Sequence, residues 1–163
     1  AAFKALNDTA GERAALKQWV EVDDEATDAY LRIIELAAAD QDWATVTRNC
    51  ERYLAVNPLV APPYRHLAQA AAGTGDDSTA VVAWRTLIQL DVPERADAHY
   101  QLARLLHKRG DTVEARRHAL LSLEETPRYR AALRLLLEMN RTPSTALPAT
   151  LPTDPVPPSK KVE

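Results

Sequence analysis

The sequence predicts an all-α protein in which pairs of antiparallel helices stack into a solenoid. Apolar residues recur at intervals of three and four, the spacing of one helix face. This pattern itself recurs with a period of about 34 residues, which indicates a repeat architecture. The chain of 163 residues has only 4 glycines, and only 6% of its residues are aromatic. An all-β fold needs more turn residues than this composition supplies.

The composition excludes several classes of protein. Hydrophobic residues make up 46% of the chain and charged residues 26%, so disorder of the whole chain is excluded. The net charge of −3 gives no reason to expect a nucleic-acid or a membrane partner. No apolar run approaches the roughly 20 residues of a membrane span, and no signal peptide opens the chain. The single cysteine, Cys50, cannot form an internal disulfide. We therefore expect a soluble chain, with the cytoplasm favoured as its compartment.

The repeat is visible at matching apolar positions. Tyr30 and Tyr64 are 34 residues apart, and the register resumes after one inserted residue near Pro93, so that Leu67 and Leu102 are 35 apart. Further pairs at these spacings are Ile33 and Leu67, Ala37 and Ala71, Val46 and Ala80, Ala80 and Ala115, and Leu102 and Leu136. Each period therefore holds the same structural unit.

The apolar pattern of each unit predicts two amphipathic helices, here called helix A and helix B. In the first full unit, residues 28–39 form helix A and residues 43–55 form helix B. The first turn falls at Asp40–Asp42. The later turns fall at Gly73–Asp76 and Arg109–Asp111, where glycine terminates one helix and aspartate can cap the next. The array spans residues 1–140, with full units at 27–60, 61–95 and 96–129 and half units at 8–26 and 130–140. Because the array starts in mid-repeat, we expect a fragment of a longer, bacterial protein.

The segment 141–163 differs from the array in composition. It carries 6 of the 11 prolines, and proline removes a backbone donor and fixes φ, so no helix runs through it. We expect a disordered tail or linker. Two interpretations stay open, a solvated spacer and a proline-rich ligand for an aromatic groove.

The repeat resembles the tetratricopeptide (TPR) repeat in its period, its helix pairing, its small residues and its closing proline. The stretch from Ala98 through Leu102, Ala103, Gly110 and Ala115 to Pro127 carries this resemblance, and so does the stretch from Tyr30 to Pro58. The resemblance covers about residues 7–140 and implies a right-handed superhelix. Three positions depart from the small residue of the family pattern, namely Ile34, Leu137 and Glu12.

The resemblance implies a concave groove lined by the A helices, and the charge distribution suggests its chemistry. Residues 1–60 hold 6 Lys/Arg against 11 Asp/Glu, whereas residues 96–141 hold 9 against 6. The groove therefore turns basic toward the C-terminal end of the array, although solvated helix faces would give the same pattern. The groove residues expected to contact a peptide, which we expect to be acidic, are Arg65, Gln69, Tyr100, Gln101, Arg104, His107, Lys108 and Arg134.

A subclass of TPR domains holds the C-terminal carboxylates of a peptide with basic and amide side chains. Arg65 and Gln69 match two of its positions, and Gln101 matches a third. Ala131 and Leu135 stand where this subclass has a basic pair, so the resemblance to this carboxylate clamp is half complete.

No arrangement of residues predicts catalysis, a metal or a cofactor. The four histidines do not form a His-Glu-x-x-His pair, and no glycine-rich loop is present to hold a phosphate. We expect Cys50 to be a buried structural thiol, His99 a packing residue, and Trp19, Trp43 and Trp84 parts of the core.

Two hypotheses about function follow. The first is a non-catalytic scaffold that binds a peptide segment, or a sister domain of its own chain, along the helix-A groove. The second is the structural or regulatory tail of a larger enzyme, such as a peptidase, which packs on the catalytic domain.

Overall fold

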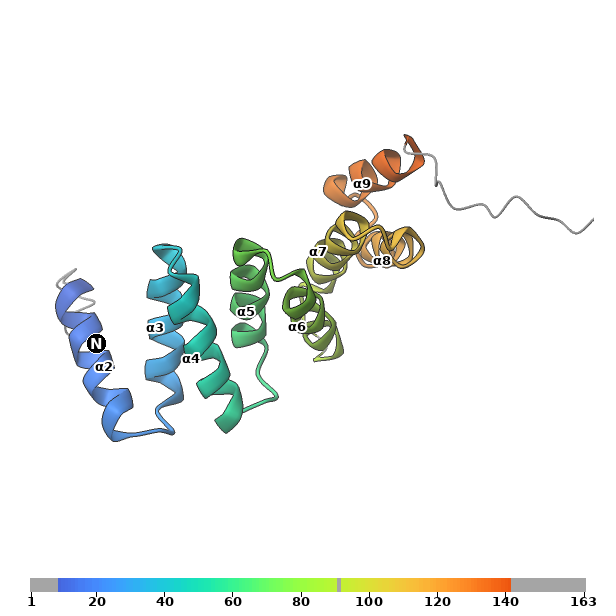
Figure 1. Cartoon of the computed structure of the whole chain (residues 1–163). Helices are drawn as coiled ribbons and strands as arrows, with labels where there is room; N and C mark the ends of the chain where they lie inside the picture. Colours follow the sequence, from blue (N-terminus) through green and yellow to red (C-terminus); the bar gives the residue numbers. More distant parts are fainter. Residues whose placement is uncertain (1–8, 91, 142–163) are drawn as a thin grey trace, which may run out of the picture.

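The computed structural model describes residues 9–90 and 92–141 and confirms the all-α repeat fold (Figure 1). The prediction of a tail at 141–163 falls, beyond Arg141, outside the described residues. Within them, the helices are α2 (Thr9–Val22), α3 (Thr27–Ala39), α4 (Trp43–Val56), α5 (Ala61–Thr74), α6 (Asp77–Gln89), α7 (Arg95–Lys108), α8 (Thr112–Glu125) and α9 (Arg130–Arg141).

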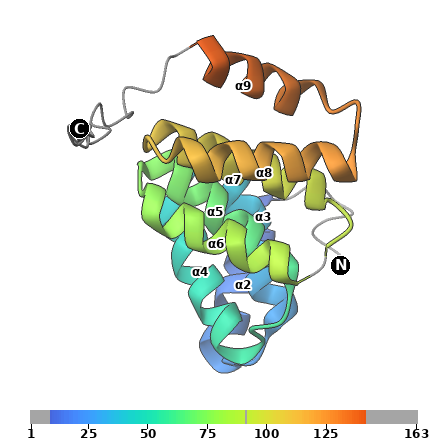
Figure 2. The ribbon, with the colours of Figure 1, turned by 90° about the vertical axis from the view of Figure 1, so that its right-hand side faces the viewer.

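The helices stack in chain order. Each helix packs on the next one along the chain, and α3 also contacts α5 while α7 contacts α9. Figure 1 shows α2 to α5 side by side, and the stack then turns so that α6 to α8 are seen closer to end-on. Figure 2 shows α9 running beside α8 at one end of the stack. The A helices of the predicted units are α3, α5, α7 and α9, and the B helices are α2, α4, α6 and α8.

The aspartate cap predicted at Asp76 is present, and Asp42 supplies a further cap at the start of α4. The Asp42 carboxylate accepts a hydrogen bond from the Thr45 backbone N–H at 3.1 Å, and Asp76 accepts one from Thr79 at the same distance. These bonds hold the pKa of Asp76 down at about 2, and they lower the pKa of Asp42 as well. Asp111 differs, because its side chain makes no capping hydrogen bond to α8.

One glycine has a different role from the predicted one. Gly75 ends α5 with a left-handed φ of 81°, but Gly73 lies inside α5 and does not end it. A Cβ built on Gly73 would lie 2.6 Å from Nε1 of Trp43. Gly73 therefore lets the start of α4 approach α5 closely.

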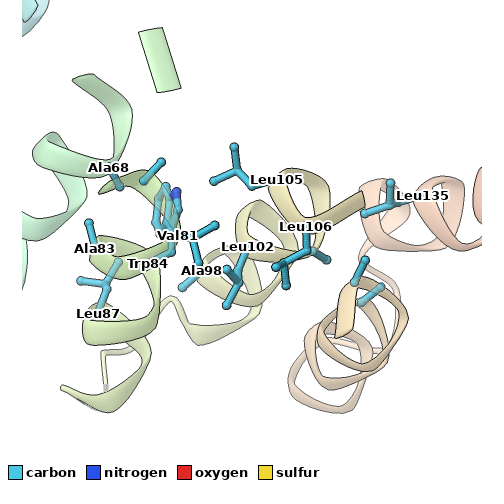
Figure 3. Close-up of a cluster of buried hydrophobic side chains, with 14 of the residues drawn as sticks. Ala68, Val81, Ala83, Trp84, Leu87, Ala98, Leu102, Leu105, Leu106 and Leu135 are labelled. Carbon is cyan, nitrogen blue, oxygen red and sulfur yellow. The ribbon is translucent and has the colours of Figure 1, made fainter. Parts of the chain in front are cut away.

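The small residues predicted for helix crossings are buried as expected. Ala80 and Ala115 are both 0% exposed. The largest apolar cluster extends from α5 to α9, with Trp84 and Leu102 at its centre and Leu135 of α9 at its edge (Figure 3). Two smaller clusters join α2 to α3 and α4, and α3 to α4 and α5.

The prediction that all three tryptophans belong to the core is wrong for Trp19. Trp84 is buried and Trp43 is half-buried, but the Trp19 side chain is 49% exposed. Its equivalents one and two periods on, Tyr53 and Leu87, are 7% and 1% exposed. In those units helix A covers this position, whereas among the described residues no helix A packs beside α2 from the N-terminal side.

Candidate peptide-binding groove

The A helices of the C-terminal part of the stack border two adjoining pockets. A pocket of about 250 Å³ lies between α5 and α7, and one of about 510 Å³ lies between α7 and α9 beside the ends of α5 and α6. Ala72 and Arg104 line both pockets, so the two form one continuous hollow, here called the concave groove. The first pocket is lined by Ala68, Gln69, Ala72, Trp84, Asp97, Gln101 and Arg104. The second is lined by Ala72, Asp77, Arg104, Leu105, His107, Lys108, Leu135 and Glu138.

Five of the eight residues predicted from the sequence line this groove. Gln69 and Gln101 face each other across the first pocket from α5 and α7. His107 and Lys108 line the second pocket, and Arg104 stands between the two. They meet because α7 is an amphipathic helix, so residues three and four apart share its groove-facing side.

The other three predicted residues lie outside the two pockets. Arg134 lines a separate hollow of about 310 Å³ on α9, together with Leu137, Glu138 and Arg141. The Tyr100 ring packs edge-on against Tyr129, with 5.4 Å between the ring centroids. The Arg65 guanidinium already donates a hydrogen bond of 2.8 Å to the Glu94 carboxylate.

The groove holds fewer unpaired cations than the sequence suggests. Lys108 pairs with Asp77 at 2.9 Å, as Arg65 pairs with Glu94. No ion pair joins Arg104 or Arg134 to a carboxylate in the part of the chain that the structure describes. Both side chains belong to exposed residues, so their charges are available to a ligand.

A network of hydrogen bonds fixes the polar wall of the first pocket. Asp97 accepts a bond of 2.7 Å from the Tyr129 hydroxyl and one of 3.3 Å from the Gln101 amide. Burial of Tyr129 and its bond to Asp97 raise the pKa of the tyrosine, which therefore stays a neutral donor. The network holds Gln101 against the pocket and orients its amide.

His107 supplies the least satisfied polar atom of the second pocket. Its Nδ1 is buried and has no hydrogen-bonding partner among residues 9–90 and 92–141. A buried polar atom without a partner costs about 1–3 kcal/mol.

Asp77, which lines the groove, and Glu94, which pairs with Arg65 outside it, were not among the predicted site residues. Asp77 begins α6, a B helix, so the register of groove-facing positions along the A helices did not include it. Glu94 lies in the turn before α7, outside the helical periodicity altogether. The sequence shows that each residue is acidic, but it does not indicate which cation each one pairs with.

The expected roles of the remaining candidates agree with the structure. Cys50 is fully buried, and burial raises the pKa of its thiol to about 12, so it is a packing residue. His99 is 5% exposed and stacks on His118, with 3.0 Å between their Nδ1 atoms. Burial lowers the pKa of both imidazoles.

The described residues contain no group of three His, Cys, Asp or Glu side chains placed to hold a metal ion. None of the described helices combines the length and the apolar character needed to cross a bilayer.

Solved structures of TPR proteins share this fold. The crystal structure of MamA matches with a TM-score of 0.78 at 16% identity, over 86% of this chain and 81% of that one. The TPR domain of Arabidopsis OM64 matches with a TM-score of 0.66 at 13% identity, over 74% of this chain and 99% of that one. An O-GlcNAc transferase of Thermobaculum terrenum matches with a TM-score of 0.56 at 24% identity, over 73% of this chain and 26% of that one. No protein-family model and no curated protein matches the sequence. The chain has the fold of a TPR solenoid.

Proposed function

We propose that the chain is a non-catalytic interaction scaffold that binds an acidic protein segment in the concave groove. The observation that carries this proposal is the position of Arg104, which lies without an ion-pair partner at the junction of the two pockets. His107, whose buried Nδ1 has no hydrogen-bonding partner among the described residues, lines the same hollow. A carboxylate at this junction would receive two parallel hydrogen bonds from the guanidinium.

The rest of the groove narrows the class of ligand. Leu135 stands where a complete carboxylate clamp has a basic residue, and it lines the second pocket beside Leu105. This pocket therefore fits an apolar side chain better than a second carboxylate. Asp97 and Glu138 also line the groove and would repel a uniformly acidic peptide. We infer a segment in which one acidic residue is followed by an apolar one.

The existing ion pairs are a small obstacle to such a ligand. Exposed pairs such as Arg65–Glu94 and Lys108–Asp77 contribute only about 0.2–1 kcal/mol each. A ligand carboxylate could therefore replace Asp77 on Lys108, or Glu94 on Arg65, at little cost. The glutamine amides of Gln69 and Gln101 would bind the peptide backbone between these charges.

The test is a titration of short acidic peptides against wild-type protein and an Arg104→Glu/Arg134→Glu double variant, at low and high salt. We expect the double variant to bind at least tenfold more weakly, a loss of about 1.4 kcal/mol. Affinity of the wild type should also fall with salt, because salt screens exposed charges. The matched control is Arg116→Glu/Arg117→Glu, which removes two exposed arginines from α8. Equal binding by the folded groove variant and the wild type would refute the proposal.

A second candidate function is that of a packing module on a catalytic domain. The observation in its favour is the Thermobaculum terrenum enzyme, of which this fold covers only 26% of the chain. Under this alternative the same groove would hold a sister domain. Co-purification of the chain with the domain encoded next to it in the gene, abolished by Arg104→Glu/Arg134→Glu, would favour the alternative. Binding of free acidic peptides without such an association would refute it.

A further inference from the structure

A third hollow lies between two B helices near the N-terminal end of the stack, where the resemblance to TPR solenoids puts the convex face. It has a volume of about 490 Å³, and residues of α3 form its floor between walls formed by α2 and α4. We call it the convex trough. It is lined by Arg13, Lys17, Val20, Glu21, Ile33, Leu36, Ala37, Asp42, Thr45, Arg48, Asn49 and Arg52.

The walls of the convex trough are basic and its floor is apolar. Lys17 projects from α2, and Arg48 and Arg52 project from α4. All three are exposed, and no ion pair holds any of them in the described part of the chain. The floor consists of Val20 and the α3 residues Ile33, Leu36 and Ala37, of which Val20 and Ala37 are buried.

Most of the other polar and charged side chains that line the convex trough already have hydrogen-bonding or ion-pair partners. Arg13 forms an ion pair with Asp40 and also donates to the Leu36 carbonyl. Asp42 accepts the capping hydrogen bond from Thr45, so its charge is used by the N-terminus of α4. The Asn49 amide donates to the Thr45 carbonyl at 2.7 Å. Glu21 is the one remaining carboxylate of the lining, against three unpaired cations.

The same position two repeats later shows what the convex trough lacks. Arg85 of α6 is equivalent to Lys17, and Glu114 of α8 is equivalent to Thr45. Arg85 and Glu114 form an ion pair of 2.6 Å that links their two B helices. In the convex trough Thr45 stands in place of that glutamate, so no ion pair of this kind links the two walls in the described part of the chain, and the three unpaired cations outnumber Glu21. An anionic occupant would offset this excess of positive charge.

We propose that the convex trough binds an acidic amphipathic helix of a partner protein. The lining of α4 runs from Asp42 to Arg52, about 15 Å at the helical rise, which suits a helix of about ten residues. Apolar side chains of that helix would rest on Ile33 and Leu36, and carboxylates on both flanks would meet the cations of the two walls. This is the helix-in-groove mode of recognition, with specificity supplied by charge. The surface is separate from the concave groove and does not depend on its function.

The experiment uses three labelled twelve-residue helical peptides and fluorescence anisotropy. One carries leucines at helical spacing and glutamates elsewhere, one has lysines in place of the glutamates, and one has alanines in place of the leucines. We expect the first to bind, and the other two to bind at least tenfold more weakly. All measurements are made in the Arg104→Glu/Arg134→Glu background, which removes binding in the concave groove. In that background Lys17→Glu/Arg48→Glu/Arg52→Glu should abolish the difference between the glutamate and lysine peptides.

Two controls make the result specific. Arg116→Glu/Arg117→Glu changes exposed arginines on α8 and should leave binding unchanged. Circular dichroism checks that each variant keeps its helix content. The proposal is overturned if the folded triple variant still prefers the glutamate peptide, or if the α8 control loses as much affinity. Complete loss of binding in the Arg104→Glu/Arg134→Glu protein would place the glutamate peptide in the concave groove alone and would overturn the proposal equally.

Discussion

The close approach of α4 to α5 at Gly73 gives a sharp test of the packing. We consider Gly73→Ala, which adds one methyl group to a position inside α5. The new Cβ would lie 2.6 Å from Nε1 and 2.7 Å from Cε2 of Trp43, whereas ordinary contacts begin at 3.4 Å. The indole ring must therefore move by about 0.8 Å, or the two helices must separate.

Two effects of opposite sign determine the result. Alanine is favoured over glycine in a helix by about 0.8–1.0 kcal/mol. Overpacking of a close contact typically costs about 1–3 kcal/mol. In the wild type we therefore expect Gly73→Ala to lower the free energy of unfolding by about 0–2 kcal/mol. In a Trp43→Ala background only the helix preference remains, and the same substitution should raise it by about 1 kcal/mol.

The assay is urea denaturation of the four proteins of this cycle, followed by far-UV circular dichroism. The quantity of interest is the coupling between Gly73 and Trp43, which should amount to about 1–3 kcal/mol. If Gly73→Ala stabilises both backgrounds by the same amount, the indole does not pack on α5 as described. An unchanged m-value in each variant checks that the same amount of surface unfolds.

Two further predictions concern the α7–α8 pair. The fully buried Ser122 donates a hydrogen bond to the Ala96 carbonyl at 2.7 Å. The substitution Ser122→Ala should therefore lower the free energy of unfolding by about 1 kcal/mol. An unchanged urea midpoint would show that the bond contributes nothing to stability. Burial lowers the pKa of His99 and of His118, so the unfolded chain takes up protons that the folded chain does not as the pH falls below about 6.5. Thermal stability should therefore fall between pH 7 and pH 5, and less steeply in His118→Gln; a melting temperature that rises over this range would contradict the assignment.

The fold was predictable because the same pattern of apolar and small residues recurs in each repeat unit. Tyr30, Leu102 and Ala115 each stand at a position that recurs in the other units, so period and helix pairing agree without any structure. Gly73 shows the limit of this reasoning. Its sequence context is that of a helix terminator, and only the contact with Trp43, 30 positions earlier, reveals its role.

The candidate site was predictable in its location but less so in its charge. The helical register placed Gln69 and Arg104 on one side of the A helices, the resemblance to the carboxylate clamp added Gln101, and the structure brings the three together. The pairing of Lys108 with Asp77 depends on how α6 sits beside α7, which no local pattern specifies. The convex trough was missed for a related reason, because the N-terminal residues are acidic in sum while Lys17 and Arg48 converge in space.

The proposed function is tested most directly by mapping where an acidic peptide binds. The measurement is the change in backbone amide NMR chemical shifts of isotopically labelled protein on titration with a pentapeptide that carries one glutamate followed by leucine. We predict that the largest changes cluster on α5, α7 and α9, at Gln69, Gln101, Arg104 and His107, and that they vanish in Arg104→Glu/Arg134→Glu. Changes confined to the B helices, or none at saturating peptide, would contradict the assignment of the concave groove as the binding surface.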